Sequence, residues 1–165
     1  MALAIIFQIE GGWTEIDGGT NYGIRAATLA RANNLKIVET QDIRKLTRNE
    51  AAAIYYKMFW LESGSYKYPY PLNLVMFDAA VHMGPGEAKR LLRVAVQGTS
   101  STKVRPIAQR YVVERYKKLR TLKNYPKYRR GWQKRMRIIM NHVINGRKPN
   151  NKKTFVPDSK FSFAA

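Results

Sequence analysis

The chain has 165 residues, 45% of them hydrophobic, which is enough for one compact core. It contains no cysteine, and this excludes disulfide bonds and thiolate metal sites. Lys and Arg number 30 against 11 Asp and Glu, and the formal charge of +19 predicts attraction to a polyanion without identifying it. No apolar run approaches the roughly 20 residues that a membrane-spanning helix needs.

The first apolar stretch, residues 3–9, predicts a helix that ends at the two glycines 11–12, so that Glu10 lies at its C-terminus. The opening residues have no basic leader, so we interpret them as a mature helix and not as a signal peptide. Segments 13–16 and 20–24 then flank an Asp-Gly-Gly sequence that is typical of a hairpin turn. We expect this hairpin to lie beside Glu10.

Helical patterns continue through the rest of the first 97 residues. Residues 26–32 predict one helix, and the capping box at 47–50 opens another. Residues 72–83 form a mostly apolar helical pattern, and a further helix is predicted over 87–97. The fold class predicted from these elements is mainly α.

The composition changes after a polar linker at 98–102. Residues 103–153 hold 18 of the 30 basic residues and one acid, Glu114, and their apolar spacing predicts amphipathic helices. The last residues show no periodicity. The expected organisation is a catalytic region at 1–97, a basic helical region at 103–145 packed on it, and a loosely held tail at 146–165, together forming one compact domain.

Hydrolysis of a glycosidic bond needs a carboxylic acid that protonates the leaving oxygen, usually with a second carboxylate that activates water. Glu10 suits the first role, because an apolar helix before it and bare glycines after it leave a partly desolvated carboxyl with room for a sugar. Asp17, in the predicted turn, suits the second, and Thr20 could hold the same water. The alternatives are a Glu that only ends a helix, an ordinary turn Asp and an ordinary strand Thr.

Other polar and aromatic side chains receive simpler interpretations. Asp78 lies within an apolar helical pattern, so we expect a structural ion pair or hydrogen bond for it. His82 and His142 lack metal-ligand spacing to any acidic cluster, so we expect no metal and no cofactor. Tyr22 and Tyr68 lie in predicted loops and are candidates for stacking on sugars.

Five groups of residues, taken together and in order, resemble glycoside hydrolase family 108, the muramidase-type phage endolysins with an associated predicted peptidoglycan-binding region. The resemblance implies a helical, lysozyme-like fold with a small hairpin, and cleavage of the β-1,4 bond between N-acetylmuramic acid and N-acetylglucosamine. It also implies that Glu10 is the catalytic acid, and its motifs add Trp13 and Asn21 to the substrate-binding residues. The groups are residues 10–13, 17–24, 46–60 and 77–86 and, more loosely, Gly131-Trp132 with Arg135.

The leading hypothesis is a soluble, monomeric peptidoglycan muramidase whose basic 103–153 face holds anionic cell-envelope polymers. We expect it to accumulate in the host bacterial cytoplasm until the membrane is permeabilised and then to reach the cell wall, or else to be carried in the virion. One rival is a lytic transglycosylase, for which Asp17 is dispensable. A rival of another class is a helical nucleic-acid-binding protein, although we do not expect nucleic acid to be the main partner. Its predicted phosphate contacts are Arg129, Arg130, Lys134, Arg135 and Arg137.

Overall fold

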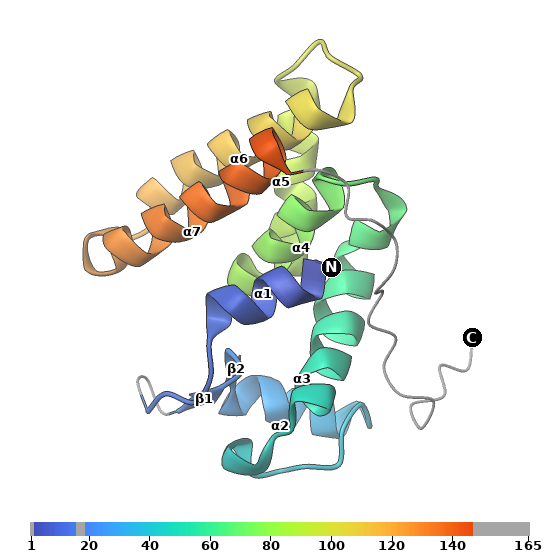
Figure 1. Ribbon diagram of the computed structural model, residues 1–165, viewed down its shortest axis with the longest axis vertical. Helices are drawn as coiled ribbons and strands as arrows, with labels where there is room; N and C mark the ends of the chain where they lie inside the picture. Colours follow the sequence, from blue (N-terminus) through green and yellow to red (C-terminus); the bar gives the residue numbers. More distant parts are fainter. Residues whose placement is uncertain (1, 16–18, 147–165) are drawn as a thin grey trace. The chain divides into compact units, whose positions relative to one another are not determined.

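The computed structural model describes residues 2–15 and 19–146. In this part of the chain the fold is mainly α-helical with one two-stranded antiparallel sheet, which confirms the predicted class (Figure 1). The chain divides into two compact units, one that ends at Phe59 and one that begins at Trp60. The first unit contains the sheet, and the second is built from helices.

The first unit opens with α1 (Ala2–Glu10), whose Ile6 is fully buried. The helix ends because Gly11 adopts a left-handed φ of +75°, and its amide donates to the Phe7 carbonyl at 3.2 Å. Glu10 is therefore the last helical residue, as predicted.

Local capping also explains the helices that follow. Helix α2 (Ala26–Asn34) runs two residues further than predicted, and the short 3-10 segment η2 (Ile43–Lys45) comes after it. Helix α3 (Arg48–Ile54) begins with the predicted capping box, in which the Glu50 amide donates to Thr47 Oγ1 at 3.2 Å and the Thr47 amide donates to Glu50 Oε2 at 2.9 Å. From Tyr55 to Leu61 the same helix continues with π geometry (η3).

The sheet corrects one arm of the predicted hairpin, because residues 20–24 contain a turn of their own. Strand β1 (Thr20–Asn21) pairs with β2 (Ile24–Arg25), so the turn of the sheet is Tyr22-Gly23. Both turn residues have positive φ, 52° and 75°, as a two-residue turn that follows the strand twist requires. Among the described residues, the predicted pairing of 13–16 with 20–24 appears as an antiparallel bridge between Thr14 and Thr20, and residues 16–18 lie outside the described residues.

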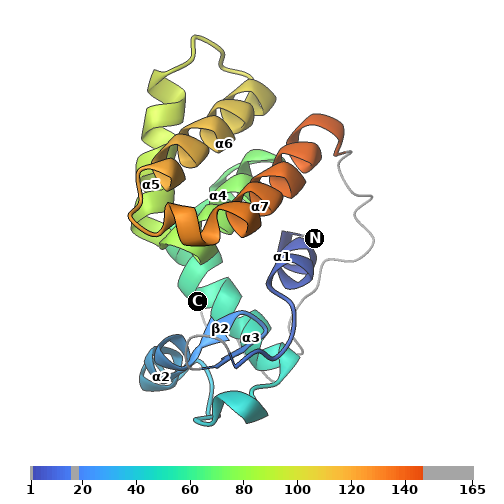
Figure 2. The same cartoon turned by 90° about the vertical axis from the view of Figure 1, so that its left-hand side faces the viewer.

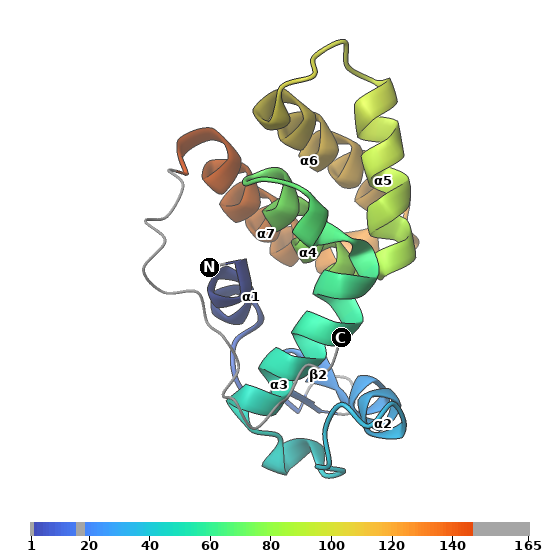
Figure 3. The same ribbon diagram turned by 90° about the vertical axis from the view of Figure 1, so that its right-hand side faces the viewer.

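The second unit contains the 3-10 turn η4 and four long helices. Helix α4 packs against α5 and α6, and α6 runs beside α7, as Figures 2 and 3 show from two sides. Helix α5 begins two residues earlier than predicted, because a proline at the first helical position has no amide that needs a partner. The bounds are η4 (Ser65–Lys67), α4 (Leu72–Met83), α5 (Pro85–Gln97), α6 (Val104–Arg120) and α7 (Tyr125–Asn145).

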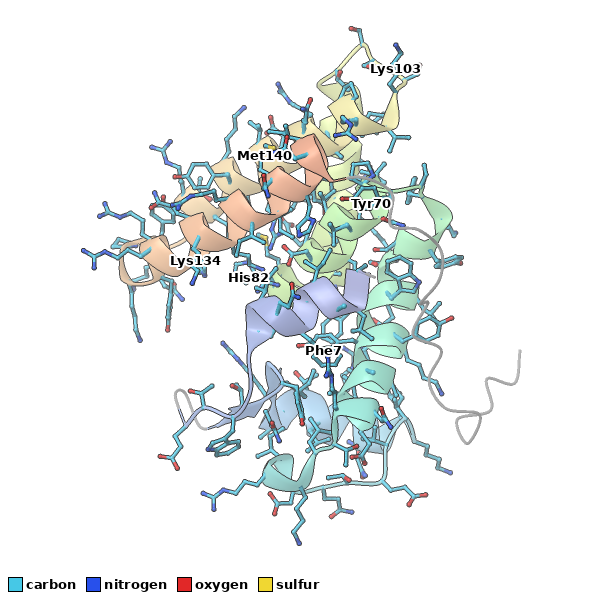
Figure 4. The ribbon with its side chains drawn as sticks, in the orientation of Figure 1. Phe7, Tyr70, His82, Lys103, Lys134 and Met140 are labelled. Atoms are coloured by element: carbon cyan, nitrogen blue, oxygen red, sulfur yellow. The ribbon has the colours of Figure 1, made fainter. Side chains whose placement is uncertain are left out.

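The C-terminal end of α7 is held by side chains from other parts of the second unit. Tyr70, labelled in Figure 4, donates its hydroxyl to the His142 carbonyl at 2.8 Å. The guanidinium of Arg105 donates to the carbonyls of Val143 and Ile144. The His142 carbonyl also accepts from the Gly146 amide at 3.0 Å, so the last turn of α7 is held by both backbone and side-chain bonds, which tie it to α6 and to the segment before α4.

Candidate active site

Glu10 lies against the turn of the hairpin. Its side chain is partly buried, and a methyl group added at Gly23 would come within 2.6 Å of Glu10 Cβ and 2.8 Å of Glu10 Cγ. Only a glycine backbone can approach the acid so closely. The expectation that the hairpin lies beside Glu10 is therefore confirmed, although the contact is made by Gly23.

Aromatic side chains hold this turn in place. Tyr55, at the start of the π segment, donates its hydroxyl to the Tyr22 carbonyl at 2.7 Å. The ring of Phe7, which projects from α1 in Figure 4, meets Tyr55 edge-on at 5.6 Å and Tyr22 at 6.0 Å between centroids. These contacts stabilise Tyr22 in a left-handed conformation that is unusual for a side chain of its size.

A hollow of about 400 Å³ opens on one face of α1. The guanidinium of Arg48 stacks over the Phe7 ring at 4.9 Å, so the wall combines aromatic surface with a positive charge. Aromatic faces stack on sugars, and a guanidinium binds carboxylates. The lining residues are Ala4, Phe7, Gln8, Gly11, Gly12, Tyr22 and Arg48, and Glu10 directly precedes Gly11 in the chain.

Three further predicted residues lie in the same unit with different roles. Thr20 is partly buried, and its backbone exchanges hydrogen bonds of 2.8 and 2.9 Å with Thr14. Trp13 is 42% exposed and covers Gly19, with the Arg44 guanidinium 5.6 Å from its ring centre. Asn21 is buried, and the structure gives it a positioning role.

The amide of Asn21 is used to hold the segment that precedes α3. Its Nδ2 donates to the Ile43 carbonyl at 3.1 Å and to the Leu46 carbonyl at 3.2 Å. Both bonds reach more than 20 residues along the chain, so Asn21 anchors β1 to η2. These contacts are structural, and a direct contact between Asn21 and substrate stays a prediction.

Two predicted site residues are not part of this arrangement as described. Asp17 lies outside the described residues, so its assignment as the second catalytic group stays a prediction. Tyr68 belongs to the second unit, where it is partly buried and lines another hollow.

Asp78 has the structural role that its apolar setting predicts. Its carboxylate is fully buried and ion-pairs with Arg115 and, at 2.9 Å, with Arg135, and Arg115 also lies 3.0 Å from Nδ1 of His82. Burial by itself would raise the pKa of Asp78, but the charges and hydrogen bonds of the two arginines outweigh it and lower the pKa. The carboxylate is thereby kept ionised within the core.

Within residues 2–15 and 19–146, no three His, Asp or Glu side chains form a group that could hold a metal ion. In the same part of the chain, no helix has both the length and the apolar character needed to cross a membrane.

Comparison with known proteins places these features in a family. Residues 3–84 match the family described as Glycosyl hydrolase 108. The chain belongs to this family through that region. The matched segment contains α1, the hairpin, α3 and Asp78, and family membership makes the protein a glycoside hydrolase and supports peptidoglycan as its substrate.

A solved structure extends the likeness beyond the matched segment. The structure titled "Structure of Brucella abortus SagA" is 24% identical, covers 90% of this chain and 95% of that chain, and has a TM-score of 0.76. At this identity the likeness shows the fold, and it confirms the mainly α-helical, lysozyme-like architecture that the family resemblance implies. A search of curated proteins gives no match.

Three residues around Glu10 are not among the predicted site residues. The sequence places Arg48 in the capping box and in the 46–60 group, Tyr55 in the 46–60 group and Gly23 in the 17–24 group, without a role at the site. One signal for Gly23 was available, because Asn-Tyr-Gly-Ile at 21–24 places a glycine in the second position of a two-residue turn. The contacts of Arg48 and Tyr55 join residues 41 and 33 positions apart and have no local signature.

Proposed function

We propose that the chain is an N-acetylmuramidase that cleaves the β-1,4 bond between N-acetylmuramic acid and N-acetylglucosamine, with Glu10 as the general acid. The observation that supports it most directly is the position of Glu10 at the end of α1, where it packs on Gly23 and directly precedes Gly11, which lines the hollow. The Phe7 and Tyr22 rings offer stacking surfaces, and Arg48 offers a partner for the lactyl carboxylate of muramic acid.

The proposed reaction needs one proton transfer to the leaving group and one activated water. The Glu10 carboxyl gives its proton to the glycosidic oxygen as the bond between this oxygen and C1 of the muramic acid residue breaks. Asp17 and Thr20 position the water, whose oxygen forms the new bond to C1 and whose proton passes to a carboxylate. The products are a new reducing end at muramic acid and a free 4-hydroxyl on the neighbouring sugar.

The basic helices suggest how the enzyme stays on its substrate. The exposed residues of α6 and α7 include many Lys and Arg, and residues 115–146 contain no acid. This density of charge favours binding to anionic cell-envelope polymers and weakens with added salt. The proposed setting is a phage or prophage endolysin that reaches the wall after membrane permeabilisation.

Product analysis tests the bond and the mechanism together. Purified sacculi are digested with the full chain, and the soluble fragments are analysed by mass spectrometry before and after borohydride reduction. The muramidase proposal expects muramic acid at the reducing ends, with Glu10→Gln as the blank. Anhydro-muramic ends would show a lytic transglycosylase, and reducing N-acetylglucosamine ends would show a glucosaminidase; either result overturns the proposal.

The same basic face also favours a second candidate function, the binding of nucleic acid. A gel shift of DNA at physiological salt, combined with intact sacculi after digestion, would favour that function over wall hydrolysis. The muramidase proposal expects the reverse, namely fragmented sacculi and DNA binding that disappears as the salt concentration rises.

A further inference from the structure

A second hollow, in the second unit, has no role in the chemistry proposed for Glu10. Its volume is about 300 Å³, and it lies between the segment that contains η4 and the side of α5. Three cations and one carboxylate line it, together with two tyrosines. These charged and aromatic residues are Glu62, Tyr66, Lys67, Tyr68, Lys89 and Arg93.

The backbone that presents the two tyrosines is tightly fixed. Ser63 and Ser65 are buried, and their hydroxyl oxygens are 2.6 Å apart. Ser63 Oγ also donates to the Trp60 carbonyl at 3.2 Å and accepts from the Ser65 amide at 3.3 Å. Gly64 supplies the left-handed φ of +73° that this turn needs. A binding surface on such a segment is organised in advance, which lowers the entropic cost of holding a ligand.

The tyrosines offer ring surface to a ligand. Tyr66 is 54% exposed, Tyr68 is partly exposed, and both line the hollow. The ammonium group of Lys67 lies 5.7 Å from the centre of the Tyr66 ring, so charge and ring surface are presented together. This pairing suits a sugar that carries a negative group.

The cations on α5 point to the charge of that ligand. Lys89 and Arg93 are one helical turn apart, and the positions three and four residues away from each of them hold no Asp or Glu. Like charges at this spacing destabilise a helix. By contrast, Arg90 on the same helix is paired with Glu87 at 2.7 Å. The hollow itself holds three cationic side chains, Lys67, Lys89 and Arg93, against the single carboxylate of Glu62, so its lining has an excess of positive charge that an anionic ligand would balance.

We propose that this hollow is a second glycan-binding site, which holds a carboxylate-bearing sugar of the peptidoglycan strand apart from the Glu10 site. Lys89, Arg93 and Lys67 bind the carboxylate, Tyr66 and Tyr68 stack on the sugar, and Glu62 accepts hydrogen bonds from its hydroxyl groups. The inference rests on peptidoglycan being the substrate. The second site would bind the polymer without taking part in bond cleavage.

Amide chemical shifts test the site without relying on catalysis. The full chain with Glu10→Gln, labelled with ¹⁵N, is titrated with the disaccharide N-acetylglucosaminyl-N-acetylmuramic acid. We expect saturable shifts at residues 62–68 and 89–93, and at least about tenfold weaker binding there for neutral chitobiose, which lacks the carboxylate. The double variant Lys89→Gln with Arg93→Gln should weaken binding of the disaccharide at this site by a similar factor.

The matched control removes two charges from another exposed place, by Lys134→Gln with Arg137→Gln on α7 (Figure 4 labels Lys134). It should leave the shifts at 62–68 and 89–93 unchanged. No shifts at those residues, equal binding of chitobiose, or binding of glycerol phosphate polymer alone overturns the second site. Because this experiment measures binding, its failure can be told apart from failure of the proposed function. If the wild type digests sacculi but these shifts are absent, only the second site is refuted. If the sacculi stay intact, the muramidase proposal is refuted.

Discussion

The two acids that follow apolar helical sequence, Glu10 and Asp78, have opposite surroundings in the two units. Glu10 ends its helix, remains partly exposed, packs on the glycine backbone of the turn, and directly precedes Gly11, which lines an open hollow. Asp78 lies within α4, is fully buried, and is held by two arginines. Access and charge compensation therefore decide what an acid in an apolar helix does: the first can reach a substrate, and the second stays ionised in the core.

The largest expected effect concerns Glu10. Glu10→Gln removes the acidic proton and keeps the shape of the side chain, so the rate of sacculus hydrolysis should fall by about 10²–10⁴-fold. The free energy of unfolding should change by less than about 0.5 kcal/mol, because the group is not part of the core. Turbidity loss of sacculi and urea unfolding measure the two quantities. If Glu10→Gln hydrolyses sacculi at the wild-type rate, Glu10 is not the general acid.

Asp78 should behave in the opposite way. Asp78→Asn leaves Arg115 and Arg135 buried without a counter-charge, and we expect a loss of about 3–5 kcal/mol in the free energy of unfolding. Hydrolysis per folded molecule should be unchanged. Urea unfolding followed by circular dichroism measures this loss. The control is Glu87→Gln, which breaks the more exposed pair with Arg90 and should cost less than about 1 kcal/mol. Equal losses for the two variants would contradict the comparison.

Acid should weaken the protein through the same group. The pKa of Asp78 is lowered in the folded chain, since the charges of Arg115 and Arg135 outweigh the opposing effect of burial. The stability contributed by this carboxylate is therefore complete above the pKa of the unfolded chain and is lost as the pH falls through the lower folded pKa. Urea midpoints measured on acidification should fall in the wild type, and Asp78→Asn should lack that component. If the urea midpoints of the wild type and of Asp78→Asn fall in parallel on acidification, Asp78 does not contribute to the acid sensitivity.

Gly23 links the hairpin to Glu10, and a side chain there should disturb both. Gly23→Ala combines the cost of a left-handed alanine with a methyl group 2.6 Å from Glu10 Cβ, about 2–4 kcal/mol in all. Hydrolysis per folded molecule should also fall, as Glu10 is displaced. Gly64→Ala has a similar φ of +73° and its nearest atom 3.8 Å away, so it controls for the backbone cost alone, about 1–2 kcal/mol. Equal stability of Gly23→Ala and Gly64→Ala would contradict the close contact between Gly23 and Glu10.

The smallest expected effect concerns the tyrosine hydroxyl that holds the turn. Tyr55→Phe deletes the bond to the Tyr22 carbonyl and should cost about 1 kcal/mol, with a lower rate of hydrolysis because the turn is less firmly placed. Tyr111→Phe is the matched control, since it deletes a 3.0 Å bond to the Ala88 carbonyl in the second unit. The control should lose similar stability and retain its rate per folded molecule. A fall in rate for both variants would point to a general loss of structure.

Much of the fold could be predicted because its signals are local. The end of α1 at Gly11 and the capping box of α3 each depend on residues no more than four positions apart. The turn at Tyr22-Gly23 was not predicted, because Asp-Gly-Gly is the stronger local turn sequence. Tyr22 adopts its left-handed conformation where Tyr55 and Phe7 contact it, and neither contact is visible from the turn sequence.

The amino-acid sequence alone determined that this is a mainly helical, strongly basic protein, that Glu10 ends a helix, and that Asp78 needs a partner. Only the tertiary structure decided that the partners are Arg115 and Arg135, 37 and 57 residues away, and that Gly23 is the residue packed on Glu10. Helix ends and charge density follow from neighbours within a few residues. Contacts between distant residues depend on how the helices pack, and this packing gave the two acids their different surroundings.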